Sequence, residues 1–325
     1  MKKKTAENDN PFAFVGGGKR YYTQNCMLRE KFGCKVIRIP LSAGFTCPNI
    51  DGTKGTGGCI YCSAGSRAYS CDPQRSITEQ YYEGRSAVKD KWGEGKYIPY
   101  FQSNTNTYGS LGKIRSVIDE AMMLPDVCGI AVSTRPDCIS EEIADYFADL
   151  SEKTYLTVEL GLQTVFDETA RKINRCHTYE DFLKGYELLA SRNVNICVHL
   201  IDGLPGETHD MMMRSAREMA KLKLHGIKLH LLHILKNTAA AAMYAAGEIS
   251  VMTLEEYVTI ICDQLEVLPP ELCIWRVTGD GERDSLIAPL WSLKKFVVMD
   301  EIDKEMRRRG SWQGKYYTKE GGGYG

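Results

Sequence analysis

The sequence predicts an α/β fold in which parallel strands alternate with helices and curl into a partial (β/α)6 barrel like an incomplete TIM barrel. Six short apolar runs are separated by segments of helical periodicity, and polar residues follow each apolar run. Strands joined through helices run parallel, and their near-continuous apolar character indicates burial on both faces. A doubly wound open sheet is the alternative, but no GxGxxG fingerprint follows a strand.

The expected strands share a run of apolar residues that ends in polar ones. They are Lys35–Leu41, Tyr97–Gln102, Val127–Ser133, Tyr155–Leu160, Val194–Ile201 and Ile227–Ile234. Helices are expected over Tyr21–Phe32, Ser76–Trp92, Ile114–Met123, Ser140–Leu150, Tyr179–Arg192 and His209–Leu224. Folds of this kind place their functional residues at the carboxyl ends of the strands. The polar residues that follow the strands should therefore share one site.

Four regions are expected along the chain. Residues 1–20 should be a flexible arm, 21–238 the barrel, 239–314 a C-terminal α+β extension packed on the barrel, and 315–325 a disordered tail. The extension should contain helices over Ala239–Gly247 and Thr253–Leu268, a strand in LCIWR, and a last helix. The apolar stripe expected on that last helix is Leu290, Leu293, Val297, Ile302 and Met306.

Composition limits where function can lie. The chain has 325 residues with a formal net charge of -1, so any RNA-binding surface has to be a local patch. Twelve cysteines, several of them inside apolar runs, and no visible signal peptide or long apolar span indicate a protein of the reducing cytoplasm.

A glycine-rich loop over residues 44–66, directly after the first expected strand, gathers Cys47, Cys59 and Cys62. These thiols could hold either of two metal centres. Zinc prefers four ligands in a structural site, with Cys71 as the fourth, whereas an iron–sulfur cluster held by three thiolates keeps one iron open. The loop lies at the end of the strands where the other polar residues gather, which favours a catalytic cluster.

Seven stretches in a fixed order carry a resemblance to a known family. They are GFTCPNIDGTKGTGGCIYC, FQSNTNTY, STRPD, ELGLQT, NRCHTYEDF, HLIDGLPGET and RVTGDGERD. With them the chain resembles the radical S-adenosylmethionine (SAM) enzymes, and among these the YhcC/YtqA-type family, which is related to the catalytic subunit of Elongator. The resemblance spans about residues 20–314. It implies the partial barrel, a [4Fe–4S] cluster and SAM on the open iron.

The resemblance also implies roles for individual residues. Cys47, Cys59 and Cys62 would hold the cluster, Arg175 would suit the SAM carboxylate through its two-pronged guanidinium, and His199 would lie near the ribose. The full set of implied SAM contacts is Tyr61, Gln102, Ser103, Asn104, Ser133, Gln163, Arg175, His199 and Leu232, with Leu232 offering backbone groups on the sixth strand.

Candidates for substrate chemistry are Glu159, Arg276 and Arg283. Glu159 stands between two apolar strand residues, so it either points inward, paired with Arg135 or Arg175, or faces solvent. Buried carboxylates are rare unless paired, which favours a functional role. Arg276 and Arg283 lie in the last strand and the loop after it and could hold a substrate carboxylate. His230 is interpreted as structural.

The resemblance implies radical generation with an electron from flavodoxin or ferredoxin. The resemblance implies a role in tailoring the wobble uridine of tRNA, in which a carboxymethylaminomethyl side chain becomes an aminomethyl one that a separate methyltransferase can then complete. Two alternatives stay open: a radical SAM oxidase or lyase acting on a small molecule, and a non-catalytic, zinc-stabilised RNA-binding protein.

Overall fold

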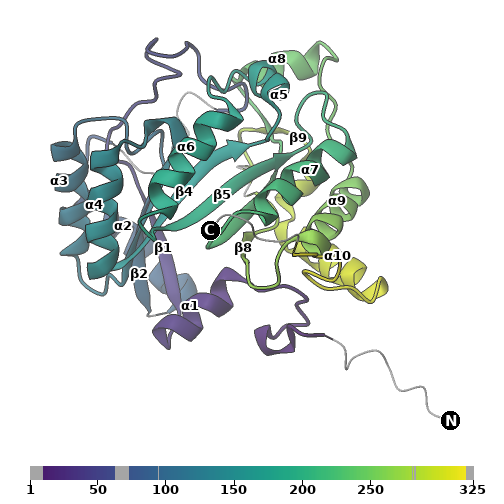
Figure 1. Cartoon of the computed structure of the whole chain (residues 1–325), viewed down its shortest axis with the longest axis horizontal. Coiled ribbons are helices and arrows are strands. Elements are labelled where there is room, and N and C mark those ends of the chain that lie inside the picture. Colours follow the sequence, from purple (N-terminus) through teal and green to yellow (C-terminus); the bar gives the residue numbers. More distant parts are fainter. Residues whose placement is uncertain (1–9, 63–72, 94, 280, 282, 320–325) are drawn as a thin grey trace.

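The computed structural model describes residues 10–62, 73–93, 95–279, 281 and 283–319, without the side chains of residues 90–92. Seven parallel strands form one sheet in the order β1-β2-β3-β4-β5-β6-β8, curled into a half-barrel (Figure 1). The strands are β1 Val36–Leu41, β2 Lys96–Phe101, β3 Gly129–Thr134, β4 Tyr155–Gln163, β5 Asn195–Asp202, β6 Gly226–Leu231 and β8 Cys273–Arg276. The predicted fold class is confirmed.

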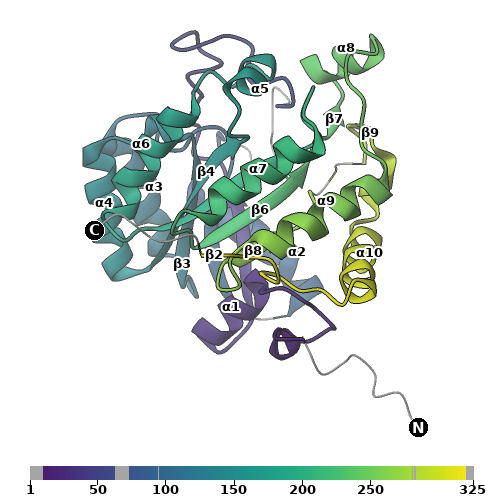
Figure 2. The same ribbon diagram turned by 45° about the vertical axis from the view of Figure 1, so that its right-hand side comes forward.

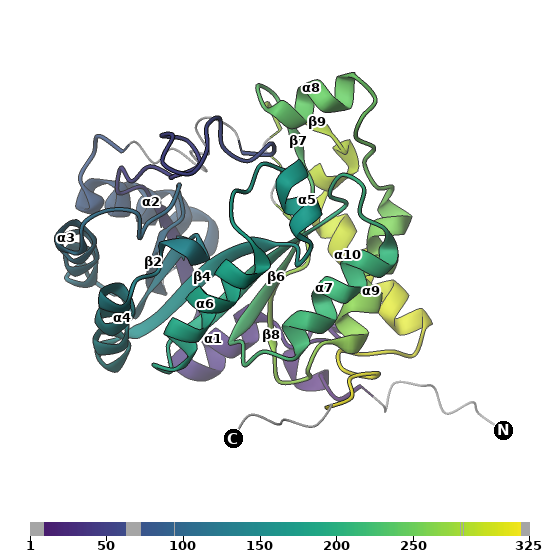
Figure 3. The same cartoon turned by 45° about the horizontal axis from the view of Figure 1, so that its top comes forward.

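Helices follow one another around the outer face of the sheet, with α2 on α3, α4 on α6, and α9 on both α7 and α10 (Figure 3). They are α1 Gln24–Phe32, α2 Ile77–Trp92, α3 Leu111–Met122, α4 Glu141–Lys153, α5 Asp167–Lys172, α6 Tyr179–Ala190, α7 His209–Ala220, α8 Ala239–Ala245, α9 Leu254–Val267 and α10 Lys295–Arg308. Capping boxes at Ser76, Thr178 and Thr253 fix the starts of α2, α6 and α9. In the described part of the chain, no helix is long and apolar enough to span a membrane.

Alternate strand residues enter two apolar layers, as the period of a β-strand requires. On β4, Leu156 and Val158 belong to the outer layer between sheet and helices. Tyr155 faces the interior of the half-barrel, where Met27 and Leu28 of α1 close one end. The helices and α1 together cover both faces, which explains the near-continuous apolar strands.

The segment after the barrel extends the sheet. Strand β8 pairs in parallel with β6, beginning at Gly226 and Cys273. Strands β7 (Ile234–Leu235) and β9 (Leu286–Ala288) form a small antiparallel pair. A short 3-10 turn over Leu290–Leu293 then leads to α10. The division of the chain at residue 238 remains a prediction.

The flexible arm expected over residues 1–20 stays a prediction, although Lys19 and Arg20 contact the C-terminal part of the chain (Figure 2). Phe12 is buried, and Lys19 forms an ion pair with Asp303 of α10 at 2.5 Å. Arg20 donates a hydrogen bond to the carbonyl of Ser311 at 3.2 Å. Residues 1–9 lie outside the described residues, as do residues 320–325 of the predicted tail.

The apolar stripe predicted for the last helix is wrong in its first half. Val298, Ile302 and Met306 are buried, whereas Leu290 and Val297 are exposed. The chain makes a 3-10 turn before Lys294 and starts α10 only afterwards, so a stripe drawn through both segments has the wrong register.

Candidate active site at the carboxyl ends of the strands

A cavity of about 310 Å³ opens at the carboxyl ends of the strands. At one end, which we call the thiol end, it is lined by Cys47, Cys59, Tyr61, Cys62, Arg135, Arg175 and His177. At the other, which we call the charged floor, it is lined by Tyr100, Glu159, His199, Lys228, His230 and Arg276. Gln102, Asn104, Ser133 and Gln163 line it as well. The predicted convergence of polar strand ends is therefore present.

The loop after β1 holds its three cysteines as free thiols on this cavity. The amide of Cys62 donates to the carbonyl of Cys59 at 3.0 Å, and the amide of Ile60 to the carbonyl of Ile173 at 3.1 Å. A hydrogen bond from Cys62 lowers the pKa of Cys59 to about 6, with a smaller contribution from Arg135. The same hydrogen bond, together with burial, raises the pKa of Cys62 well above its usual value. Three thiols of one loop that line one cavity fit a cluster on three cysteines.

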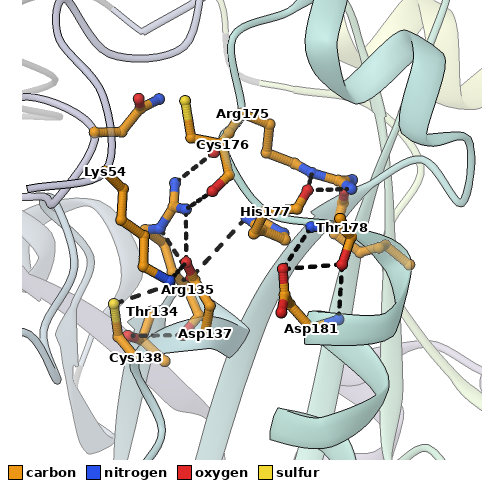
Figure 4. A network of polar contacts seen from close by, with 12 residues as sticks. Lys54, Thr134, Arg135, Asp137, Cys138, Arg175, Cys176, His177, Thr178 and Asp181 are labelled. Carbon is orange, nitrogen blue, oxygen red and sulfur yellow. Dashed lines mark hydrogen bonds and ion pairs between the residues drawn. The ribbon is translucent and has the colours of Figure 1, made fainter.

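Arg135 ties the thiol end together (Figure 4). Its guanidinium donates to both carboxylate oxygens of Asp137, at 3.0 and 2.9 Å, and to the carbonyls of Arg175 at 2.7 Å and Cys176 at 3.2 Å. Lys54 of the cysteine loop reaches the same Asp137 at 2.6 Å. These contacts join the cysteine loop, the end of β3 and the segment after α5, and they place a cation beside the thiols.

Arg175 is almost fully buried and is directed at the backbone. Its guanidinium donates to the carbonyls of Leu162 and Thr164, the latter at 2.7 Å. It also donates two hydrogen bonds to the carbonyl of His177, from Nε at 3.1 Å and from Nη2 at 2.9 Å. These bonds fix the turn after β4, where Gln163 has a φ of 66°. The predicted contact between Arg175 and the SAM carboxylate stays a prediction.

His177 beside it is also buried, and in the described part of the chain neither of its ring nitrogens has a hydrogen-bond partner. Burial, with Arg175 and Arg135 close by, lowers the pKa of His177 to about 2. The imidazole is therefore neutral, and its Nδ1 lies 4.0 Å from Oδ1 of Asp137, too far for a hydrogen bond (Figure 4).

Glu159 is the centre of the charged floor and is fully buried. It accepts hydrogen bonds from Lys228 Nζ at 2.5 Å, His199 Nε2 at 2.7 Å and Tyr100 Oη at 2.8 Å, and it forms an ion pair with Arg38. The predicted pairing with Arg135 or Arg175 is wrong. Glu159 faces the interior of the half-barrel, where β1 and β6 present their own cations, whereas Arg135 and Arg175 are bound in the turns beyond the strands.

The charged floor carries a surplus of positive charge. Burial alone would raise the pKa of Glu159, but the nearby charges of Arg38 and Lys228 hold that pKa well below its usual value. Burial lowers the pKa of Lys228 to about 8 against the opposing effect of Glu159, so the amine is still largely protonated at neutral pH. Burial also lowers the pKa of His199 to about 4. One carboxylate is thus paired with two cations, Arg38 and Lys228, an arrangement that suits an anionic ligand group.

Most of the predicted cofactor residues are brought to this cavity, but some are not. Ser103 is buried without lining it. Leu232 follows β6 rather than lying on it, and packs with Ile60 and Ile173 in a separate apolar cluster. Arg283 is exposed and does not line this cavity. Of the two candidate arginines for substrate binding, only Arg276 belongs to the site.

Sequence reasoning missed Arg38, Tyr100 and Lys228, and it assigned His230 to the core although His230 lines the cavity. A usable signal existed for two of them. Arg38 in VIRIPL and Lys228 in GIKLHL are single charges inside buried strands, as Glu159 is. Single charges of this kind on neighbouring strands of a barrel indicate an interior network, since each needs a partner.

Comparisons with known proteins identify the class. A family model described as the radical SAM superfamily matches residues 50–219, and a second, the Radical_SAM C-terminal domain, matches residues 224–308. The chain belongs to the radical SAM superfamily, whose members use a [4Fe–4S] cluster and SAM, and it is an enzyme of that class. This excludes the non-catalytic zinc alternative; Cys71, its fourth ligand, lies outside the described residues.

Within the superfamily the chain belongs with YtqA and YhcC. It is 44% identical to YtqA of Bacillus subtilis over 96% of this chain and 97% of that protein, and 34% identical to YhcC of Escherichia coli over 87% and 91%. The chain is also 27% identical to a protein named tRNA uridine(34) acetyltransferase from Methanocaldococcus jannaschii, over 59% of this chain and 33% of that protein. It is 21% identical to Elongator complex protein 3 of Schizosaccharomyces pombe, over 78% of this chain and 53% of that protein. In structure, Elp3 of Methanocaldococcus infernus has the same fold, with a TM-score of 0.62 at 18% identity over 86% of this chain and 64% of that one.

Proposed function

We propose that this enzyme shortens a carboxymethylaminomethyl side chain on the wobble uridine of tRNA to an aminomethyl group. The observation that carries the proposal is the charged floor, where Lys228 and Arg276 line the cavity. Such a floor suits a substrate that carries a carboxylate close to the reacting carbon. Similarity to a tRNA uridine(34) acetyltransferase and to Elongator complex protein 3 supports uridine 34 of tRNA as the substrate base.

The thiol end would hold the cluster on Cys47, Cys59 and Cys62, and SAM would lie against Gln102, Ser133 and Gln163. When bound, the cluster and SAM supply a 5′-deoxyadenosyl radical that removes one hydrogen atom from the substrate. The residues of the charged floor would position the substrate for this step. Arg276 and protonated Lys228 hold the carboxylate, and the hydrogen bonds among Tyr100, Ser133 and Glu159 keep the floor rigid.

The reaction balances with SAM as the two-electron oxidant. The methylene between the amine and the carboxylate would lose a hydrogen atom to form 5′-deoxyadenosine. The substrate radical would then release one proton and return one electron to the cluster, which leaves an imine. Water hydrolyses the imine to the aminomethyl group and a two-carbon aldehyde acid, glyoxylate. The remaining product of SAM is methionine.

The proposal implies particular partners. A reduced flavodoxin or ferredoxin would deliver the electron that first reduces the cluster, and a tRNA methyltransferase would complete the aminomethyl product. These reactions belong to the cytoplasm, where we expect the enzyme to act.

Nucleoside mass spectrometry of tRNA from cells lacking the gene tests the proposal. We expect carboxymethylaminomethyluridine to accumulate and its aminomethyl and methylaminomethyl derivatives to disappear. An unchanged wobble-uridine profile would exclude the proposed substrate.

A small carboxylate-bearing substrate is the second candidate, and the near-neutral net charge of -1 favours it. Salt dependence separates the two candidates. RNA binding through several phosphates weakens steeply as salt increases, whereas binding of a small molecule does so only slightly.

A further inference from the structure

One imidazole of the charged floor makes no hydrogen bond. His230 on β6 is partly exposed and lines the cavity at the carboxyl ends of the strands. Among the described residues its ring has no hydrogen-bond partner, and its recorded ring contact is with His199. The ring nitrogens of His177 are closed off inside the protein, whereas those of His230 are not. The ring of His230 can therefore meet a molecule in the cavity.

The neighbouring groups of the charged floor are engaged with one another. Glu159 accepts hydrogen bonds from Lys228, from Nε2 of His199 and from Tyr100. Lys228 is largely protonated at neutral pH, and burial raises the pKa of Tyr100 above its usual value, so neither readily accepts a proton. This leaves the ring of His230 to receive a proton from a bound molecule.

The position of His230 on β6 suits the proposed substrate. Lys228 and His230 are two residues apart on one strand, so their side chains project from the same face, about 6.5 Å apart along it. His230 is the one nearer the carboxyl end of β6. In the proposed substrate one carbon separates the amine from the carboxylate. A carboxylate held by Lys228 therefore puts the amine on the side of His230.

The surroundings of His230 keep its ring neutral. Burial lowers the pKa of His230 well below its usual value, and His199, Arg276, Lys228 and His233 add to this effect. These are the titratable and charged groups that act on it from β5, β8, β6 and the segment after β6. A neutral imidazole keeps one nitrogen lone pair, which can accept a proton.

We propose that His230 is the catalytic base that takes a proton from the substrate amine after hydrogen abstraction. The assignment rests on the proposed reaction. Abstraction leaves a radical carbon beside a protonated amine, whose nitrogen has no lone pair to share with that carbon. Transfer of one N–H proton to His230 frees the lone pair and makes the radical a better electron donor. Loss of one electron, as in the proposed reaction, then forms the C=N bond of a protonated imine, and His230 passes its proton to water.

The test is anaerobic incubation of the cluster-reconstituted enzyme with SAM, dithionite and tRNA whose carboxymethylaminomethyluridine carries two deuterium atoms on the methylene beside the carboxylate. Mass spectrometry measures aminomethyluridine per 5′-deoxyadenosine and the deuterium content of the recovered substrate. His230→Gln keeps a polar side chain that cannot accept a proton at neutral pH. His225→Gln is the matched control, because His225 is also partly exposed, bonds Tyr155 Oη at 2.7 Å and does not line the cavity.

We expect one aminomethyluridine per 5′-deoxyadenosine from the parent and from His225→Gln. His230→Gln should still abstract deuterium, but it should lower this ratio by about 100-fold, the low end of what a general base contributes. Its radical would then be quenched by the reductant and a solvent proton, so recovered substrate should carry one deuterium in place of two. Added imidazole should restore part of the ratio in His230→Ala, which it would not do for a folding defect.

Two results would overturn the assignment while leaving the proposed reaction in place. One is a parent-like ratio in His230→Gln without loss of deuterium from the recovered substrate. The other is loss of 5′-deoxyadenosine itself in His230→Gln at an unchanged melting temperature, which would place His230 before the proton transfer. A parent enzyme that forms 5′-deoxyadenosine but leaves the tRNA side chain intact would instead contradict the proposed reaction, and the assignment with it.

Discussion

Replacing Glu159 with glutamine should destabilise the protein strongly, because it leaves two buried cations without their counter-charge. Lys228 is 5% exposed and Arg38 is 16% exposed, and both are paired with the fully buried Glu159. Breaking such a pair from one side costs about 3–5 kcal/mol. We therefore expect Glu159→Gln to lower the free energy of unfolding by about that amount, measured as a shift of the urea midpoint.

The charge of Lys228 sets the pH dependence of this loss. The pKa of Lys228 lies at about 8, below its ordinary value of 10.5, because it is buried. Above about pH 8 the folded protein releases the proton of Lys228 while the unfolded chain keeps it, so the cost of burying this charge falls. The free energy of unfolding therefore rises with pH between about 8 and 10.5. Without Glu159 this release begins at lower pH, so the deficit of Glu159→Gln should shrink between neutral pH and about pH 9.

A double-mutant cycle with Lys228→Met separates charge from packing. The double variant should be more stable than the sum of the two single losses by at least about 1 kcal/mol, because it removes both charges. Glu168→Gln, which breaks only an exposed pair with Lys172, is the control and should change nothing measurable. A parent-like urea midpoint for Glu159→Gln, or strictly additive losses, would refute the reasoning.

Three further predictions concern separate parts of the chain. Cys59→Ser should abolish the cluster absorbance and its bound iron, whereas Cys262→Ser, buried in the outer apolar layer, should retain both. Arg135→Lys loses the fork on Asp137 and should shift the reduction potential of the reconstituted cluster, measured by anaerobic titration; an unchanged potential and iron content would contradict the role assigned to that arginine. Burial raises the pKa of Asp202 to about 7 from 3.8, so the cost of folding it grows as pH rises toward 7. Asp202→Asn should therefore stabilise the protein more at about pH 8 than at about pH 5, by about 2–3 kcal/mol in urea unfolding, and an equal effect at both pH values would contradict this.

The alternation of strands and helices could be predicted because it is written locally. Apolar runs and capping residues mark each element, and Ser76, Thr178 and Thr253 cap helices in the structure. The seventh sheet strand, β8, carried the same local signal. Its pairing with β6 was not predictable, because pairing depends on where the chain returns and not on the four residues Cys273–Arg276 themselves.

The candidate site could likewise be predicted only in part from the sequence. Cys47, Cys59 and Cys62 have a spacing that can be read directly, and all three line the cavity. The partners of Glu159 could not be read, because Arg38 lies 121 residues away and Lys228 lies 69 away. Only closure of the half-barrel brings them together.

The most direct test of the central claim is anaerobic incubation of the cluster-reconstituted enzyme with SAM, dithionite and tRNA that carries carboxymethylaminomethyluridine. Mass spectrometry then follows the nucleoside and the nucleoside-derived product of SAM together. We predict equal amounts of 5′-deoxyadenosine and aminomethyluridine, with glyoxylate released and with no nucleoside product from Cys59→Ser. Formation of 5′-deoxyadenosine with the tRNA side chain intact would contradict the proposed substrate, and no 5′-deoxyadenosine from a fully loaded cluster would contradict the assigned chemistry.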